Sequence, residues 1–280
     1  MKKHLAFVLG GGGARGALQV GALRALFEAG FKPDLLVGTS IGAANAAALA
    51  LWGANLAGVE ALERQYRQVA QANLMDPRLA RITLRTLSGR QNHHASRQVE
   101  KYLITLGITP DIRFEDFPHV RLALIGADLK TGEPVIYGQD PRQSVLEGVM
   151  ASIAIPPWFA PVEKDGHLIM DGGALSNLPV EPALKMGAKE IIALDLNDPA
   201  FFSGSGPGLL PDLEQLLFFI IQRQTALEIA LAKALKVKVH YIELRSQPPI
   251  PVWDFSNYQE LIQTGYELAS RKIPGIKKAR

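Results

Sequence analysis

The chain of 280 residues contains no cysteine, which excludes disulfide bonds, thiolate metal sites and cysteine nucleophiles. It also lacks any apolar run approaching the roughly 18 residues of a membrane-spanning helix. Its net charge of only +3 gives no basis for nucleic-acid binding. The first apolar run, residues 5–9, is shorter than the core of a signal peptide, which needs about 7–15 residues. We therefore expect a soluble, cytoplasmic protein, with peripheral contact to a membrane as a further option.

The composition is otherwise that of a globular protein, with 48% hydrophobic and 20% charged residues. Short apolar runs that end at glycine predict buried strands, and apolar side chains spaced three or four residues apart predict helices. The predicted strands cover residues 5–9, 35–37, 120–127, 133–137, 167–170, 190–196 and 237–244, and the predicted helices cover 14–29, 41–52, 144–152, 212–235 and 256–271. This order predicts an α/β fold with a mostly parallel sheet in a single domain, residues 1–280.

Four segments stand outside this pattern. Residues 73–95 are rich in arginine and poor in hydrophobes, and we interpret them as a peripheral excursion whose role stays open. Residues 203–208 are interpreted as a surface loop. The apolar run 216–221 is interpreted as buried core, with a lipid-facing surface or a dimer contact as alternatives. The basic segment 271–280 is interpreted as a solvated tail that could touch anionic lipid weakly.

The motif that says most about possible catalysis is Gly-Thr-Ser-Ile-Gly at residues 38–42, directly after a predicted strand. This G-x-S-x-G pattern is typical of a strand–turn–helix that exposes a serine hydroxyl. Gly38 and Gly42 lack a Cβ, so the strand and the helix can close tightly around Ser40. The sequence therefore predicts Ser40 as a nucleophile.

Four consecutive glycines, residues 10–13, follow the first predicted strand, and Arg15 and Gly16 follow them. The spacing of Gly11, Gly13 and Gly16 matches a dinucleotide fingerprint, but the second strand does not end in the carboxylate that a ribose requires, since Asp34 lies at its start. A P-loop lacks its lysine, and a tight structural turn explains only one or two of the glycines. The remaining interpretation is an oxyanion hole, because backbone N–H groups at a helix start favour negative charge.

A serine nucleophile needs a group that accepts its proton. Among the histidines, only His240 could follow an acid late in the chain, and it lies inside a predicted strand, where a structural role is more common. Asp171 ends a predicted strand and is followed by Gly172 and Gly173, which let another backbone segment approach. A buried aspartate with a raised pKa can act as the base. The alternative is that Asp-Gly-Gly forms only a turn.

Taken together, residues 11–16 (GGGARG), 38–42 (GTSIG) and 171–173 (DGG) resemble the patatin-like phospholipase family. Residues 151–162 and Asn177-Leu178-Pro179 add to a resemblance that covers roughly residues 5–200. The chain looks like a small stand-alone member.

The resemblance implies a three-layer α/β/α fold and acyl esters of lipids as substrates. It also implies a Ser40–Asp171 dyad and an oxyanion hole at Gly11, Gly12 and Gly13. No metal or organic cofactor is implied. Arg15 would either orient the loop, meet a lipid phosphate or be an ordinary first-turn residue. The competing hypothesis is a catalytically silent member of this fold that binds or regulates. The oligomeric state, the lipid and the acyl chain length stay open.

Overall fold

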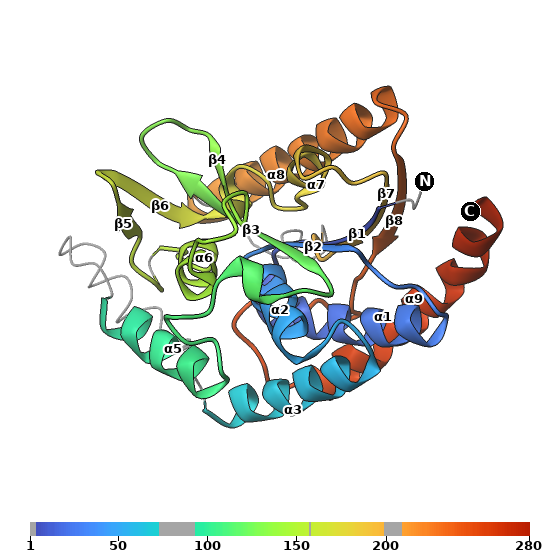
Figure 1. The fold of residues 1–280 in the computed structure, drawn as a ribbon, viewed down its shortest axis with the longest axis horizontal. Coiled ribbons are helices and arrows are strands. Elements are labelled where there is room, and N and C mark those ends of the chain that lie inside the picture. The colour runs from blue at the N-terminus through green and yellow to red at the C-terminus, as the bar shows by residue number, and fades with distance from the viewer. Residues whose placement is uncertain (1–3, 73–92, 157, 199–208) are drawn as a thin grey trace.

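The computed structural model describes residues 4–72, 93–156, 158–198 and 209–280 (Figure 1). The strands are β1 (Leu5–Leu9), β2 (Leu35–Thr39), β3 (Arg121–Asp128), β4 (Pro134–Tyr137), β5 (Val162–Lys164), β6 (His167–Asp171), β7 (Glu190–Asp195) and β8 (Lys238–Glu243). The helices are α1 (Gly16–Glu28), α2 (Ile41–Trp52), α3 (Leu56–Ala72), α5 (His93–Thr105), α6 (Val145–Ser152), α7 (Val180–Lys185), α8 (Leu209–Ala234) and α9 (Tyr258–Ala279). Every strand and helix that the sequence predicted is present, and β5, α3, α5 and α7 are additional.

The strands form one sheet in the order β5-β6-β3-β2-β1-β7-β8, and β4 also pairs with β3. The pairs β3–β2, β2–β1, β1–β7 and β7–β8 are parallel. Strands β4 and β6 pair with β3 in the antiparallel sense, and β5 pairs with β6 in the same way. The parallel strands β1, β2 and β7 therefore end at one edge of the sheet, where loops that follow different strands come together.

Helices cover both faces of the sheet (Figure 1). Strand β1 shows why, because its side chains alternate between two separate clusters of buried residues. Leu5, Phe7 and Leu9 pack with residues of α1, α2 and α9, whereas Ala6 and Val8 pack with residues of α7 and α8. These three layers confirm the predicted α/β/α fold with a mostly parallel central sheet. The segment after residue 200 contributes β8 to the same sheet.

The structure corrects one interpretation of the C-terminal third and adds a helix to another. In the run 216–221 only Phe218 is well buried, at 4% exposure, whereas Leu216, Leu217, Phe219 and Ile220 are 49–59% exposed. A helix turns just one face to a sheet, so a continuous apolar run inside α8 cannot be buried along its whole length. Residues 271–279 continue helix α9 and most of them are exposed, so the predicted solvated tail is helical.

Two other predicted segments lie largely outside the described residues. Of residues 73–95, only the last three are described, and they begin α5. The predicted loop 203–208 lies wholly outside the described part of the chain.

Candidate active site

Ser40 occupies the sharp turn between β2 and α2. Its backbone has φ 57°, a left-handed value that is uncommon for a residue other than glycine. The carbonyl of Ser40 accepts hydrogen bonds from the N–H groups of Ala43 and Ala44, which starts α2 directly after the turn. The turn thus holds Ser40 at the edge of the sheet in a strained conformation, as the G-x-S-x-G pattern predicted.

Two glycines allow this turn because other backbone atoms lie where a side chain would begin. A Cβ on Gly38 would lie 2.3 Å from the carbonyl oxygen of Gly42, and a Cβ on Gly42 would lie 2.2 Å from that of Leu9. Gly16 is constrained in a similar way, since its Cβ would lie 2.5 Å from Cγ1 of Ile41. These contacts support the packing role that the sequence suggested for Gly38 and Gly42, and they show the same constraint at Gly16.

Asp171 lies at the same level of the sheet as Ser40. Thr39 pairs with Ile125 of β3, and the next residue of β3, Gly126, pairs with Asp171 of β6. The end of β6 is therefore brought across β3 to the turn after β2. A Cβ on Gly172 would lie 2.3 Å from the carbonyl oxygen of Ile125, so the chain after Asp171 can lie directly against β3 only with glycine there.

The Asp171 carboxyl group is buried, with 4% of the residue exposed. Its Oδ1 accepts a hydrogen bond from the N–H of Gly173 at 2.8 Å. Its Oδ2 has no hydrogen-bond partner among the described residues. Burial raises the pKa of Asp171 to about 6, while the nearby Ser40 side chain and the Gly173 N–H lower it. The Ser40 hydroxyl is thus close enough to influence this carboxyl group, although the two do not form a complete hydrogen bond.

The glycine loop lies beside Ser40, because a Cβ on Gly11 would be 3.1 Å from the Cβ of Ser40. The Gly11 N–H donates to the carbonyl of Asn177 at 3.0 Å. Gly11 therefore cannot donate to an oxyanion, which corrects that part of the prediction. Among the described residues, the N–H groups of Gly12 and Gly13 have no acceptor. They lie at the start of a single 3-10 turn, Gly13–Arg15, which leads into α1.

Arg15 is buried, with 5% exposed, and its Nε donates to the carbonyl of Gly12 at 3.3 Å. Burial lowers the pKa of its guanidinium, while the negative charges of Asp198 and Asp195 raise it. Of the roles considered for Arg15, these contacts favour orientation of the glycine loop. Gly173 lies close to the Asp171 carboxylate and completes the set of predicted supporting residues.

A buried polar network behind the glycine loop was not predicted from the sequence. Gln19 Nε2 donates to the carbonyl of Gly10 at 2.8 Å, and Gln19 Oε1 accepts from Asn45 Nδ2 at 3.0 Å. Asn45 Oδ1 accepts from the Tyr66 hydroxyl at 3.2 Å. Gln19 belongs to α1 and Asn45 to α2, so the network joins the helix that follows the glycine loop to the helix that follows Ser40. A polar residue on the apolar face of a predicted helix is the only hint that sequence offers.

A second missed contact fixes the turn at Ser40 itself. Ser152, at the end of α6, is fully buried. Its Oγ accepts from the N–H of Ser40 at 3.0 Å and donates to the carbonyl of Ile125 at 2.6 Å. On the other side, Thr39 Oγ1 donates to the carbonyl of Ser176 at 2.8 Å. The backbone around Ser40 is thus held by side chains on both flanks.

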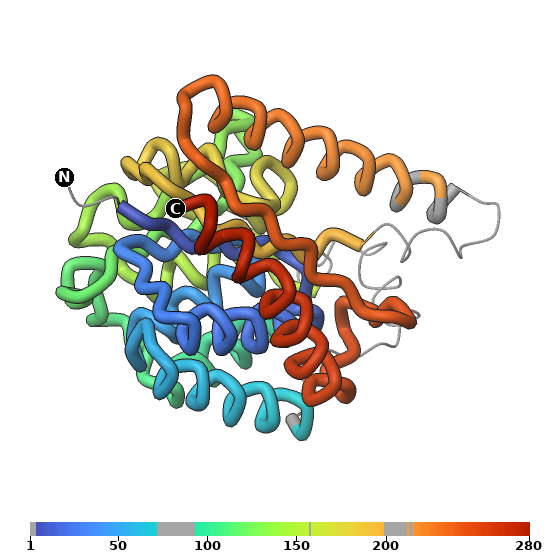
Figure 2. Tube along the Cα trace, turned by 90° about the vertical axis from the view of Figure 1, so that its right-hand side faces the viewer, coloured from blue at the N-terminus to red at the C-terminus, as the bar shows by residue number. Residues whose placement is uncertain are grey.

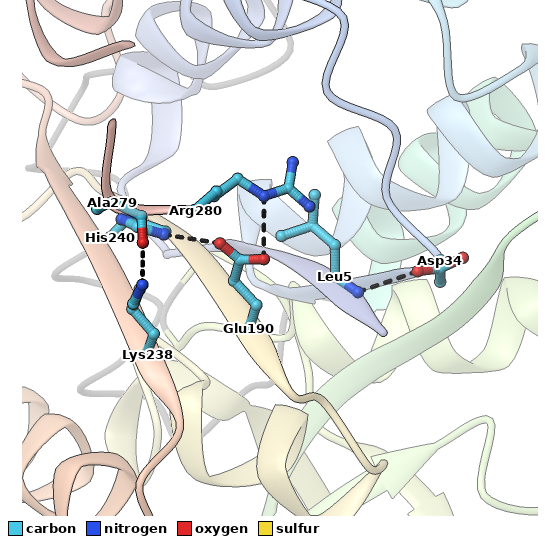
Figure 3. Close-up of polar contacts among 7 residues, drawn as sticks. All are labelled: Leu5, Asp34, Glu190, Lys238, His240, Ala279 and Arg280. Carbon is cyan, nitrogen blue, oxygen red and sulfur yellow. Dashed lines mark hydrogen bonds and ion pairs between the residues drawn. The ribbon is translucent and has the colours of Figure 1, made fainter. Parts of the chain in front are cut away.

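His240 does not reach this site. It pairs with Ile192 in β7, and β7 and β1 separate it from β2, a distance of about 14 Å for three strand spacings. Its Nε2 lies 2.9 Å from Oε1 of buried Glu190, whose other oxygen accepts from Arg280 Nε at 3.1 Å (Figure 3). Asp34 accepts from the N–H of Leu5 at the start of β1, which is the opposite edge of the sheet from Ser40 (Figure 3). Neither His240 nor Asp34 therefore lies beside the glycine loop.

The described residues contain no group of three or more His, Asp and Glu side chains arranged to hold a metal ion. No described helix is long and apolar enough to cross a membrane. What the site brings together is a serine at a strained turn, a buried carboxyl group and two backbone N–H groups without acceptors.

Comparison with known proteins identifies the family. The model of the patatin-like phospholipase family matches residues 7–184, and the chain belongs to this family. It is 34% identical over 212 residues to patatin-like phospholipase domain-containing protein 7 of Rattus norvegicus, covering 69% of this chain and 13% of that protein. It is 33% identical over 211 residues to an uncharacterized NTE family protein of Mycobacterium tuberculosis, covering 75% of this chain and 33% of that protein.

Two further matches extend over almost the whole chain. Lysophospholipase nte1 of Aspergillus terreus is 28% identical over 293 residues, which covers 98% of this chain and 18% of the fungal protein. The crystal structure of VipD from Legionella pneumophila matches with a TM-score of 0.50 at 16% identity, covering 98% of this chain and 67% of that one. The VipD match supports the fold alone. The chain spans a third or less of the length of the curated relatives named here.

Proposed function

We propose that this protein is a serine lipid acyl hydrolase that cleaves carboxylic esters of phospholipids or lysophospholipids. The observation that carries the proposal is the placement of Ser40 beside the buried Asp171, whose pKa of about 6 leaves it ionised but basic at neutral pH. Membership of the patatin-like phospholipase family and the fungal relative named as a lysophospholipase support a lipid ester as the substrate.

In the proposed reaction, Ser40 Oγ forms a bond to the ester carbonyl carbon while its proton passes to Asp171. Collapse of the tetrahedral intermediate breaks the ester C–O bond, and the leaving alcohol takes the proton from Asp171. Water then attacks the acyl-enzyme and gives a proton to Asp171, which returns it to Ser40 as the fatty acid leaves. These steps require no metal ion or organic cofactor.

The negative charge of both tetrahedral intermediates would be held by the N–H groups of Gly12 and Gly13. Three observations support this role: the loop lies against Ser40, the two groups have no described acceptor, and Arg15 and Gln19 hold neighbouring carbonyls of the loop. Fixed donors aimed at a developing oxyanion typically contribute more to rate than donors that must reorient.

The test combines active-site labelling with ester turnover. A fluorophosphonate probe should label Ser40, as read by peptide mass mapping, and p-nitrophenyl esters of increasing chain length should be hydrolysed. Ser40→Ala should lose both labelling and turnover. Ser256→Ala, a change at an exposed serine, is the matched control and should retain both. Intact phospholipids and lysophospholipids then define the acyl position.

Two results would contradict the proposal. Labelling at a different serine, or full turnover by Ser40→Ala, would assign the chemistry elsewhere. A folded wild-type protein that neither reacts with the probe nor hydrolyses any ester would favour the alternative, a catalytically silent member of the fold that binds or regulates.

A further inference from the structure

Glu228, on α8, is a buried acidic residue that the proposed reaction does not use. Only 6% of it is exposed. Its Oε1 accepts a hydrogen bond from Ser176 Oγ at 2.7 Å, and its Oε2 accepts from the N–H of Glu181 at 2.7 Å. Both partners belong to the chain that follows Asp171, since residues 172–179 connect Asp171 to α7. We call residues 172–179 the linking segment.

A carboxylate at this position has a cost. Burying a charged group is unfavourable unless hydrogen bonds replace the water that it loses. Burial raises the pKa of Glu228 to about 7, while the hydrogen bonds from Glu181 and Ser176 oppose this shift. An apolar side chain of the same size would avoid the cost, so packing of α8 alone does not account for a glutamate here.

The linking segment contacts each part of the candidate active site. It begins directly after Asp171. The carbonyl of Ser176 accepts from Thr39 Oγ1 at 2.8 Å, at the turn that carries the nucleophile. The carbonyl of Asn177 accepts from the N–H of Gly11 in the glycine loop at 3.0 Å. A shift of this segment would therefore move the proposed base, the nucleophile turn and the oxyanion loop relative to one another.

The placement of α8 lets Glu228 support this segment from one face of the sheet. Helix α8 lies beside α7 (Figure 1 and Figure 2). Both helices pack on the face opposite to α1 and α2, the helices that follow the glycine loop and Ser40. Helix α8 also lies beyond residues 7–184, which the family model matches, so the family motifs assign Glu228 no role.

We propose that Glu228 is a positioning residue, which holds the linking segment so that Asp171, Ser40 and the glycine loop keep their mutual placement. It touches no reacting atom and acts only through Ser176 and α7. The inference rests on the proposed function, because this alignment affects a rate only if Ser40 attacks an ester. Loss of alignment lowers kcat, whereas binding of the ester depends little on it.

Steady-state kinetics on a short-chain p-nitrophenyl ester test this role. Glu228→Ala should lower kcat about 10- to 100-fold and change KM less than about twofold, because misplacing catalytic groups by about 1 Å costs about 100-fold. Glu228→Gln should recover most of kcat. Its Oε1 can accept from the N–H of Glu181 while its Nε2 donates to the Ser176 hydroxyl, so both contacts survive.

Glu190→Ala is the matched control. Glu190 is 2% exposed, and each of its oxygens has a polar partner, His240 for one and Arg280 for the other (Figure 3). It lies at the start of β7, the opposite edge of the sheet from Ser40. Glu190→Ala should therefore lower the melting temperature, as Glu228→Ala does, but keep wild-type kcat.

A double-mutant cycle tests the path through Ser176. Ser176→Ala should lower kcat less than Glu228→Ala does, because the N–H of Glu181 keeps its acceptor. The double variant should lose no more than Glu228→Ala alone, whereas independent effects would multiply.

Amide hydrogen exchange, measured by NMR, tests the contact without requiring turnover. The N–H of Gly11 is held by the linking segment, so it should exchange about tenfold faster in Glu228→Ala than in the wild-type protein. Exchange at Gly11 should stay unchanged in Glu228→Gln and in Glu190→Ala.

Several results would overturn the inference: a folded Glu228→Ala with wild-type kcat, an equal loss of kcat in Glu228→Gln or Glu190→Ala, losses that multiply in the double variant, or unchanged exchange at Gly11. Circular dichroism verifies folding, and Glu228→Leu, which keeps the volume without an acceptor, replaces an alanine variant that does not fold. Wild-type protein without esterase activity, in which Glu228→Ala still speeds exchange at Gly11, would refute only the proposed function. Esterase activity that is indifferent to Glu228 would refute only this inference.

Discussion

Replacing Asp171 with asparagine should make the protein more stable at neutral pH even as it removes the proposed base. The carboxyl group is buried, and one of its oxygens has no hydrogen-bond partner among the described residues. Burial therefore disfavours the ionised form and raises the pKa from 3.8 to about 6. An asparagine has the same shape, keeps an acceptor for the Gly173 N–H and carries no charge.

The magnitude follows from the two pKa values. Between about pH 4 and pH 6 the folded protein binds more protons at Asp171 than the unfolded chain does, so stability falls as pH rises through this window. A pKa raised from 3.8 to about 6 corresponds to about 3 kcal/mol once both states are ionised, since one pH unit equals about 1.4 kcal/mol. The stabilisation by Asp171→Asn should thus be near zero below about pH 4, about half-complete at pH 5 and complete above about pH 7.

Urea denaturation of both proteins at a series of pH values measures this difference. The other titrating groups, including Glu228 with its pKa raised to about 7 by burial, are common to both proteins and cancel in the comparison. A difference in unfolding free energy that is the same at every pH reports only the exchange of an oxygen for an amide nitrogen. The test therefore rests on the part of the difference that changes with pH. A difference in unfolding free energy that stays flat between pH 4 and pH 8 would refute the reasoning, because Asp171 would then have an ordinary pKa in the folded state.

Three further predictions concern catalysis. Ser152→Ala should lose about 1–3 kcal/mol of stability and lower kcat, because the Ser40 N–H loses its partner; thermal melting and steady-state kinetics measure the two effects. Gly12→Val should lower kcat about 10²–10³-fold with little change in KM, because its Cβ would lie 2.7 Å from that of Leu196 and displace the loop; a folded variant with wild-type kcat would make the loop structural. The pH profile of kcat/KM should rise through about pH 6 as Asp171 loses its proton, and a profile flat from pH 5 to pH 8 would contradict Asp171 as base.

Much of the fold could be predicted because its signals are local. Strand β1 is an apolar run that stops at glycine, and α2 is a run of alanine after the turn at Ser40. The short elements β5 and α7 were missed because three to six residues carry too little periodicity to identify. The exposure of the run 216–221 was missed for a different reason, since composition shows that side chains are apolar but not whether anything covers them.

The candidate site, like the fold, could be predicted only in part from the sequence. Ser40 and the glycine loop each follow a parallel strand and are marked by glycine, so their placement at one edge of the sheet follows from topology. Asp171 ends β6, which is antiparallel to β3, so its place near Ser40 depends on the pairing of Asp171 with Gly126. The contacts that hold them are made across long sequence separations. Ser152 reaches Ser40 over 112 residues, and no spacing rule connects the two positions. A serine or glutamine inside a predicted helix has the same appearance in the sequence whether it faces solvent or holds a loop.

The pattern of satisfied and unsatisfied groups around Ser40 argues for chemistry over a structural turn. Folded proteins pair nearly all buried polar groups, and the N–H groups of Gly10, Gly11, Ala14 and Ser40 all have acceptors here. Beside Ser40 in the described structure, the Oδ2 of buried Asp171 has no hydrogen-bond partner, and the N–H groups of the half-buried Gly12 and Gly13 have no acceptor. Two donors and one acceptor on either side of a serine are what an ester needs when its carbonyl oxygen gains negative charge and the serine loses a proton. A buried carboxyl oxygen without a partner is costly, so a turn that serves packing alone does not account for Asp171.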